Sequence, residues 1–180
     1  MVTAITGGIA EGKSTILKCL SDLGYITLSA DEIARQLFPE PETNRRLAEA
    51  AGLAYPVTSE QLRNALIAQP NTRRAINRIM HPAVIERLVS SDAEFVEVPL
   101  LIETCTQHLF DRVWVVTCGL ETQRQRLAER YGSETDADSV LNTQLPTSVK
   151  ITFDDEVFRT NAPLQTVRRH ISVALGRRLE

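Results

Sequence analysis

The chain has 180 residues, of which 43% are hydrophobic and 24% are charged, and its formal net charge is −3. A chain of this length and composition suits one compact domain that buries a core without disulfide or metal staples. The slight negative charge argues against a broadly basic surface, so we expect no nucleic-acid partner.

The length of the apolar runs and the spacing of the cysteines indicate the cellular compartment of the protein. The longest apolar runs are far shorter than a membrane span, and no signal-peptide pattern precedes the first apolar segment after Met1. Cys19, Cys105 and Cys118 are widely spaced and form no Cys-x-x-Cys motif, so we interpret them as small apolar fillers. We therefore expect a cytoplasmic protein without membrane association.

Hydrophobic periodicity predicts that strands alternate with helices along most of the chain. Short apolar runs predict strands at residues 1–6, 25–28, 95–98, 113–116 and 157–158. Helical spacing predicts helices at residues 14–23, 31–38, 121–131, 136–145 and 164–179. This alternation favours an α/β fold in which parallel strands are joined by right-handed crossovers.

Residues 42–91 interrupt the alternation, because they carry helical signals and no strand signal. After a first helix, Thr58 or Ser59 can cap a second one. Asn71 can cap a third helix, and Pro82 suits the first turn of a fourth. So long a helical stretch between two strands indicates an insertion rather than another βα unit.

The strongest motif is Gly7-x-x-x-x-Gly12-Lys13-Ser14, which follows the first predicted strand and opens the first predicted helix. This is the complete Walker A pattern in its confirming context. Glycines allow a tight turn whose N–H groups point at phosphate oxygens, and the helix N-terminus adds positive charge. The residues that we expect to bind ATP are Gly8, Ile9, Ala10, Glu11, Gly12, Lys13, Ser14 and Thr15.

Within this loop we expect Lys13 to reach the β- and γ-phosphates and Ser14 to hold Mg²⁺. Glu11 is unusual because it brings a negative charge close to the phosphates. Its cost is small if the side chain points to solvent, since exposed charges interact weakly through water.

Other motifs narrow the class of nucleotide-binding protein. The guanine-reading N-K-x-D and the D-x-x-G switch of GTPases are absent, and no predicted strand ends in the hhhhDE pattern of helicase-type ATPases. Small kinases remain, in which a lid and an acceptor-binding insertion surround the loop. We therefore predict a P-loop NTPase fold, three-layer α/β/α, with a five-stranded parallel sheet, a helical insertion and a lid.

Five stretches in order carry a resemblance to one family: residues 5–15, 29–34, 81–82, 98–103 and 121–155. They resemble the dephospho-CoA kinase patterns T-G-G-I-G-S-G-K-S, D-A-D-x-I-A, H-P, V-P-L-L-x-E and the spacing of the lid region. The resemblance covers nearly the whole chain. It implies transfer of the γ-phosphate of ATP to the ribose 3′-hydroxyl of dephospho-CoA.

The resemblance also implies roles for individual residues and segments. The expected catalytic residues are Lys13, Asp31 and Arg130, and the expected substrate contacts are Asp31, His81, Leu101 and Glu103. A single kinase domain would divide into a nucleotide-binding core of residues 1–38, 93–118 and 151–180, an acceptor-binding insertion of residues 39–92 and a lid of residues 119–150. The expected partners are the small molecules ATP and dephospho-CoA, with a monomer or weak homo-oligomer.

The position of Asp31 supports its role independently, since it follows the second predicted strand at the sheet edge where ligands gather. A carboxylate there can accept the hydroxyl proton and orient the oxygen for in-line attack. The same position suits a helix N-cap. Glu103 likewise either contacts substrate or caps the next helix, and His81 either contacts substrate or fixes the turn before Pro82.

Arg126 and Arg130 lie four residues apart on one face of a predicted helix. They can fold over the phosphates and stabilise negative charge, or form a solvated face that pairs with Glu129.

Three departures from the family pattern leave the acceptor open. Ser29 replaces the first aspartate of D-A-D, residues 150–155 read K-I-T-F-D-D where the family has K-R-x-R-A-D, and Thr160-Asn161 replaces N-x-G. Two alternatives are therefore a kinase of another nucleoside, nucleotide or small alcohol, and a homologue that binds nucleotide without turnover.

Overall fold

The computed structural model describes residues 1–68 and 70–176, except for the side chains of 67, 68, 70 and 134–136. The chain divides into two compact units: residues 1–29 together with the chain from 92 onward, and residues 30–91. None of the helices within these described ranges is long and apolar enough to span a membrane.

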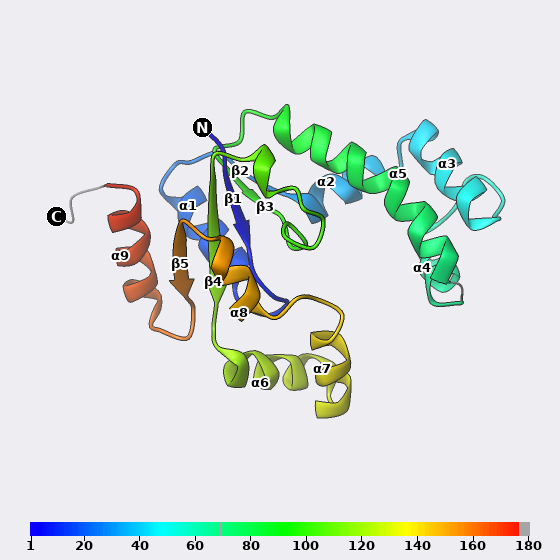
Figure 1. The fold of residues 1–180 in the computed structure, drawn as a ribbon. Helices are drawn as coiled ribbons and strands as arrows, with labels where there is room; N and C mark the ends of the chain where they lie inside the picture. Colours follow the sequence, from blue (N-terminus) through cyan, green and yellow to red (C-terminus); the bar gives the residue numbers. More distant parts are fainter. Residues whose placement is uncertain (69, 177–180) are drawn as a thin grey trace. The chain divides into compact units, whose positions relative to one another are not determined.

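The first unit is built on a sheet of five parallel strands in the order β2-β3-β1-β4-β5 (Figure 1). The strands are β1 (Thr3–Thr6), β2 (Thr27–Ser29), β3 (Phe95–Glu97), β4 (Arg112–Thr117) and β5 (Glu156–Arg159). The predicted parallel sheet and its five strands are confirmed. Because β1 is the central strand, the loop that follows it leaves from the middle of the carboxyl edge.

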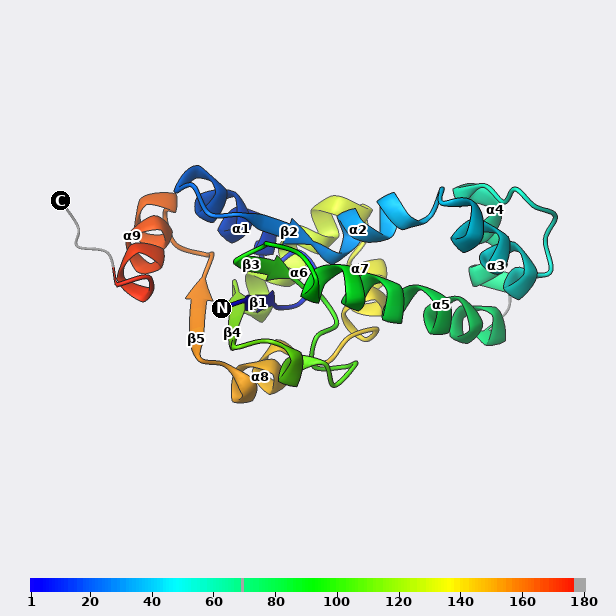
Figure 2. The same ribbon diagram turned by 90° about the horizontal axis from the view of Figure 1, so that it is seen from above.

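Helices cover both faces of this sheet, as predicted. Alternate side chains of a strand point to opposite faces, and Ile5, Trp114 and Phe158 lie in the core beneath α1 (Lys13–Asp22) and α9 (Leu164–Ala174). The short helix α8 (Thr147–Lys150) lies on the opposite side of the strands (Figures 1 and 2). The predicted closing helix extends to residue 179, and residues 177–180 lie outside the described residues.

Beyond the carboxyl end of β4, helices α6 (Leu120–Tyr131) and α7 (Glu134–Leu141) follow each other and pack together (Figure 1). Two 3₁₀ turns complete the unit, η1 (Gln107–Leu109) and η2 (Ile151–Phe153). The predicted helix at 136–145 is displaced towards the N-terminus, and α8 was not predicted. Pro146 is itself the N-cap of α8, and it disfavours helical backbone at Leu145, which the prediction had placed inside the helix.

The second unit is wholly helical, as predicted for this part of the chain. Its helices are α2 (Ala30–Leu37), α3 (Pro41–Ala51), α4 (Ser59–Ala68) and α5 (Pro70–Val89). Leu47, Val57, Leu62 and Ile76 form its core. The N–H of Gln61 donates to Thr58 Oγ1 and the N–H of Thr58 donates to Gln61 Oε1, so Thr58 supplies the predicted cap of α4.

The prediction of separate helices that begin at Asn71 and Pro82 is wrong, because α5 runs without a break from Pro70 to Val89. Proline at position 70 suits the first helical turn, which moves the start one residue ahead of Asn71. Pro82 frees the carbonyl of Arg78 from its helical hydrogen bond. Both of these residues are exposed, so water can donate to that carbonyl and the helix continues.

Candidate active site

The loop between β1 and α1 contains backbone conformations that favour glycine. Gly7 has φ 151°, and a Cβ at this position would lie 2.3 Å from the carbonyl oxygen of Val116. Gly12 has φ 90°, and its Cβ would lie 2.8 Å from Thr160 Oγ1. The first and last glycines of the motif therefore permit both the turn and its close approach to β4 and to the residue after β5.

Three consecutive carbonyl groups of the loop accept hydrogen bonds from side chains of the surrounding elements. Gln123 on α6 donates to the carbonyl of Ile9 at 2.9 Å, and Arg126 Nη1 donates to that of Ala10 at 3.1 Å. Thr160 Oγ1 donates to the carbonyl of Glu11 at 2.6 Å. Arg126 also donates to Thr160 Oγ1 and to its carbonyl, so the guanidinium joins the loop to the chain after β5.

Unlike these carbonyls, several backbone N–H groups of the loop form no hydrogen bond to the described residues. Those of Ala10, Gly12 and Ser14 have no hydrogen-bond acceptor in the part of the chain that the structure describes. Gly12 and Ser14 lie at the start of α1, where the helix dipole adds positive potential. Such N–H groups at a helix N-terminus form an anion site, as a phosphate loop requires.

Lys13 and Ser14 occupy the places that the motif predicts. Lys13 is 8% exposed, and its Nζ donates to the carbonyls of Gly7 at 3.2 Å and Gly8 at 2.9 Å. The amine therefore lies over the loop itself. Ser14 is exposed in the first turn of α1, where its hydroxyl is accessible to a ligand.

The side chain of Glu11 does not point to solvent, which was the condition for a small cost, because this residue is only 1% exposed. Its carboxylate accepts hydrogen bonds from Gly8 N–H at 2.5 Å, Thr117 Oγ1 at 3.0 Å and Thr147 Oγ1 at 2.5 Å. Three donors thus replace the water that the carboxylate loses on burial. The charged carboxylate therefore lies against Thr117 and Thr147 instead of in bulk water.

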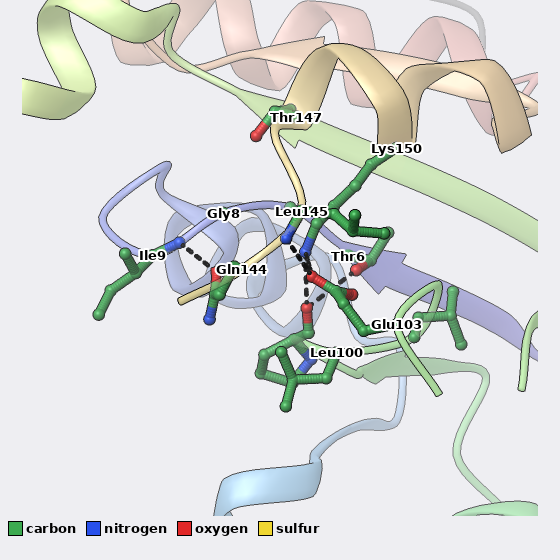
Figure 3. Close-up of polar contacts among 12 residues, drawn as sticks. Thr6, Gly8, Ile9, Leu100, Glu103, Gln144, Leu145, Thr147 and Lys150 are labelled. Atoms are coloured by element: carbon green, nitrogen blue, oxygen red, sulfur yellow. Dashed lines mark hydrogen bonds and ion pairs between the residues drawn. The ribbon is translucent and has the colours of Figure 1, made fainter. Parts of the chain in front are cut away.

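Residues 144–150, which we call the lid root, contact the loop and the strand edge together (Figure 3). The N–H of Ile9 donates to Gln144 Oε1 at 3.1 Å. Further along, Leu145 N–H donates to Glu103 Oε1 at 3.0 Å. The lid root therefore lies against both the phosphate loop and the segment after β3.

Lys150 ends the lid root and is fully buried. Its Nζ lies 2.7 Å from Glu103 Oε1 and donates to the carbonyl of Pro99 at 3.1 Å (Figure 3). The second carboxylate oxygen of Glu103 is buried and has no hydrogen-bond partner among the described residues. Glu103 thus anchors the lid root, and its predicted contact with substrate stays a prediction. Leu101, also predicted to contact substrate, is fully buried.

Two predicted acceptor residues belong to the second unit. Asp31 lies inside the first turn of α2, after Ala30, so the interpretation as an N-cap is wrong. Its carboxylate is exposed and forms no hydrogen bond within residues 1–68 and 70–176. His81 lies half-buried within α5, so the interpretation that it fixes a turn before Pro82 is also wrong. Their predicted contacts with the acceptor stay predictions.

The two lid arginines differ in their surroundings. Arg126 is half-buried and holds the loop through its carbonyl contacts. Arg130 is exposed, with its guanidinium 5.8 Å from the centre of the Tyr131 ring. Its predicted contact with phosphate stays a prediction.

Several residues that build the site had no predicted role. Thr117 and Thr147 are hydroxyl residues of a common type, and no local spacing marks them. Gln123, Gln144 and Lys150 matched the family spacing of the lid region, which was the only signal for them.

A cavity of about 780 Å³ opens beside the loop, between α6, α7 and the lid root. Gly8, Glu11 and Thr117 line it from the loop side, and Gln144 and Thr147 line it from the lid root. The buried Glu11 carboxylate therefore borders this cavity.

Comparisons of the sequence with known proteins agree on one family. The sequence model of the dephospho-CoA kinase family matches residues 1–165. The dephospho-CoA kinase of Geobacter metallireducens is 31% identical and aligns with 100% of this chain and 98% of its own length. That of Syntrophotalea carbinolica is 33% identical, with 98% and 92% covered.

Solved structures share the fold. A crystal structure from Thermus thermophilus superposes with a TM-score of 0.80 and 26% identity, over 98% of this chain and 96% of that one. The dephospho-CoA kinase from Campylobacter jejuni gives a TM-score of 0.64 at 21% identity, over 97% and 95%. At that lower identity the likeness shows the common fold alone.

Proposed function

The chain belongs to the dephospho-CoA kinase family, and from this premise we propose that it transfers the γ-phosphoryl group of ATP to the ribose 3′-hydroxyl of dephospho-CoA. The observation that carries the proposal is the phosphate loop. Its carbonyls are engaged by Gln123, Arg126 and Thr160, while N–H groups at the start of α1 have no acceptor in the described structure.

The loop supplies the nucleotide half of the reaction. Its N–H groups bind the β-phosphate, and Lys13 Nζ leaves the carbonyls of Gly7 and Gly8 to contact the β- and γ-phosphates. The amine of Lys13 then donates to charged phosphate oxygens instead of two neutral carbonyls. Hydrogen bonds to charged acceptors are stronger. The amine thereby neutralises charge on the group that is transferred.

The residues at the loop also fit a magnesium ion. Mg²⁺ usually takes one or two protein oxygens and completes its shell with phosphate oxygens and water. Ser14 offers an exposed hydroxyl in the first turn of α1. When bound, the ion neutralises charge on the β- and γ-phosphates, and Ser14 is the residue that would hold it.

Asp31 is the proposed general base. Its exposed carboxylate has no hydrogen-bond partner in the described parts of the chain, so it is available to accept a proton. The 3′-hydroxyl proton passes to Asp31 as the oxygen forms its bond to the γ-phosphorus, and the bond to the β-phosphate oxygen breaks to release ADP. His81, Leu101 and Glu103 are the proposed acceptor contacts, and Arg130 stabilises charge on the transferred group.

The proposed assembly is simple. ATP and dephospho-CoA are the partners, with no nucleic acid or membrane surface involved, and the chain acts as a monomer or weak homo-oligomer in the cytoplasm. In the proposed division, residues 1–38, 93–118 and 151–180 bind nucleotide, residues 39–92 bind the acceptor and residues 119–150 form the lid.

An assay of ADP release with ATP, Mg²⁺ and dephospho-CoA tests the activity. We expect ADP only when the acceptor is present, in amounts equal to the coenzyme A formed. ADP release that is independent of dephospho-CoA, or none at all, would refute the proposal.

Ser29 at the end of β2 favours a second candidate, because the family pattern has an aspartate there. The loss of one carboxylate beside Asp31 is consistent with a different alcohol acceptor. A screen of nucleosides, nucleotides and small alcohols against dephospho-CoA, compared by kcat/KM, separates the two. Nucleotide binding without transfer to any of these acceptors would indicate the third alternative, a homologue that lacks turnover.

A further inference from the structure

Glu11 receives hydrogen bonds from three separate segments of the first unit. Gly8 belongs to the phosphate loop, Thr117 ends β4 and Thr147 belongs to the lid root. We propose that Glu11 is a positioning residue that couples the lid root to the phosphate loop and so sets the affinity for nucleotide.

Both oxygens of the carboxylate are needed for this coupling. Oε1 accepts from Thr117 at 3.0 Å, while Oε2 accepts from Gly8 N–H and Thr147 Oγ1, each at 2.5 Å. Thr117 Oγ1 itself accepts from the N–H of Gly119 at 3.1 Å, so its own proton is directed to Glu11. The serine of the family pattern has one oxygen on a shorter side chain and cannot replace all these contacts.

The backbone of Glu11 is held as well. Its carbonyl accepts a hydrogen bond from Thr160 Oγ1 at 2.6 Å. Side chain and main chain are thus fixed by different elements. The same peptide group carries the N–H of Gly12, which has no acceptor among the described residues and faces the phosphate in the proposed function. Because the two groups share one plane, the orientation of that N–H depends on how Glu11 is held.

The space around the carboxylate is tight. A Cβ on Gly8 would lie 2.4 Å from Gln123 Nε2, 2.9 Å from Glu11 Oε2 and 3.1 Å from Thr147 Oγ1. The Glu11 carboxylate, the Gln123 amide and the Thr147 hydroxyl therefore lie close to one another and to the loop backbone at Gly8.

The lid root is also held by Glu103 on both sides of Thr147. Lys150 is fully buried against Glu103, which also accepts from Leu145 N–H. Between these anchors and the loop, Thr147 provides the link to Glu11. A displacement of the lid root thus reaches the phosphate loop through the Thr147–Glu11 hydrogen bond as well as through that of Ile9 to Gln144.

This coupling rests on the proposed function only in requiring that the loop binds ATP. The acceptor plays no part in it. A binding measurement without acceptor therefore tests the coupling separately from the transfer reaction.

The test compares Thr147→Val, which removes the hydroxyl and keeps the shape, with Thr147→Ser, which keeps the hydroxyl. The dissociation constant of a non-hydrolysable ATP analogue with Mg²⁺ is measured by calorimetry, and thermal unfolding of each variant checks that it is folded. We expect Thr147→Val to raise the dissociation constant about tenfold, the effect of one charge-assisted hydrogen bond. Thr147→Ser should restore most of the affinity.

Two further variants sharpen the result. Glu11→Gln keeps the shape of the side chain, and its combination with Thr147→Val should bind no more weakly than the weaker single variant. Thr152→Val removes an exposed hydroxyl that, among the described residues, bonds to the carbonyl of Val149 alone, and it should leave binding unchanged. Wild-type affinity in Thr147→Val, equal loss in the valine and serine variants, or multiplicative losses in the double variant would each overturn the proposal. If the valine variant does not fold, Thr147→Ala provides the same comparison with Thr147→Ser.

Discussion

The amine of Lys150 lies 2.7 Å from Glu103 Oε1, and the lysine side chain is fully buried while that of Glu103 is 18% exposed. This pair ties the lid root to the segment after β3. Removing one partner of a buried pair leaves the other charge desolvated and uncompensated.

Lys150→Met keeps the length of the side chain and removes its charge. We expect it to lower the free energy of unfolding by about 3–5 kcal/mol, as measured by denaturant titration. Lys18→Met is the matched control, since Lys18 pairs with Asp22 at the surface with 77% and 38% of the side chains exposed. That change should cost less than about 1 kcal/mol. Equal losses in the two variants would contradict the structural role of Lys150.

Gly7→Ala should disrupt the loop by direct collision. Its Cβ would lie 2.3 Å from the carbonyl oxygen of Val116, whereas a Cβ on Gly132 would have nothing within 4 Å although φ is 76°. We expect Gly132→Ala to cost about 1–2 kcal/mol from backbone strain and to leave ATP affinity unchanged. Gly7→Ala should cost more, at least about 3 kcal/mol, and abolish nucleotide binding. Calorimetric binding and thermal unfolding of both variants check this, and retained affinity in Gly7→Ala would argue against the loop geometry.

Asp31 and Glu32 provide a matched pair of acids in the first turn of α2, and both are exposed. If Asp31 is the general base, Asp31→Asn should lower kcat by at least about 100-fold. The dissociation constant for ATP should stay the same. Glu32→Gln should leave kcat close to that of the unaltered chain. Equal rates in the two variants would remove Asp31 as the base.

The cysteines should differ in reactivity. Burial raises the pKa of the Cys118 thiol, with a smaller increase from Glu11 that Arg126 opposes, whereas Cys105 is exposed. Because the thiolate is the reactive form, iodoacetamide should modify Cys105 well before Cys118 near pH 8, as read by mass spectrometry of peptides. Equal rates at the two sites would contradict the burial of Cys118.

The raised pKa of Cys118 also has a consequence for stability. The folded state holds the thiol proton to higher pH than the unfolded state does. The contribution of the protonated thiol to the free energy of unfolding is therefore fully present below the ordinary thiol pKa. It is lost as the pH rises through the pKa of the thiol in the folded state. In Cys118→Ala, the free energy of unfolding should fall less at alkaline pH, as measured by denaturant titrations at several pH values. An unchanged pH dependence in that variant would contradict the raised pKa.

The strands and the phosphate loop were predictable because their signals are local. An apolar run of four to six residues and a glycine pattern beside it are read within one window of sequence. The parallel sheet then follows from the alternation of strands with helices. The insertion was recognised in the same way, from the absence of any strand signal between residues 42 and 91.

The buried parts of the site depend on partners far away in the chain. Glu11 is satisfied by Thr117 and Thr147, which are 106 and 136 residues distant. No local pattern predicts such partners, so the sequence could not show whether this carboxylate is exposed or buried. Lys150 illustrates the same limit, because lysine is almost never fully buried unless a partner such as Glu103 is present. Proline inside a helix usually ends it, but α5 continues through Pro82. The residue whose carbonyl Pro82 leaves without a helical hydrogen bond is exposed, so water can donate to that carbonyl.

The central claim is that ATP phosphorylates the 3′-hydroxyl of dephospho-CoA with Asp31 as base. The most direct measurement incubates the chain with ATP, Mg²⁺ and dephospho-CoA and locates the added phosphate on the ribose by phosphorus NMR. We predict a single product phosphorylated at the 3′-oxygen, formed at least about 100-fold more slowly by Asp31→Asn. No phosphorylated product, phosphate at another position, or an undiminished rate in Asp31→Asn would contradict it.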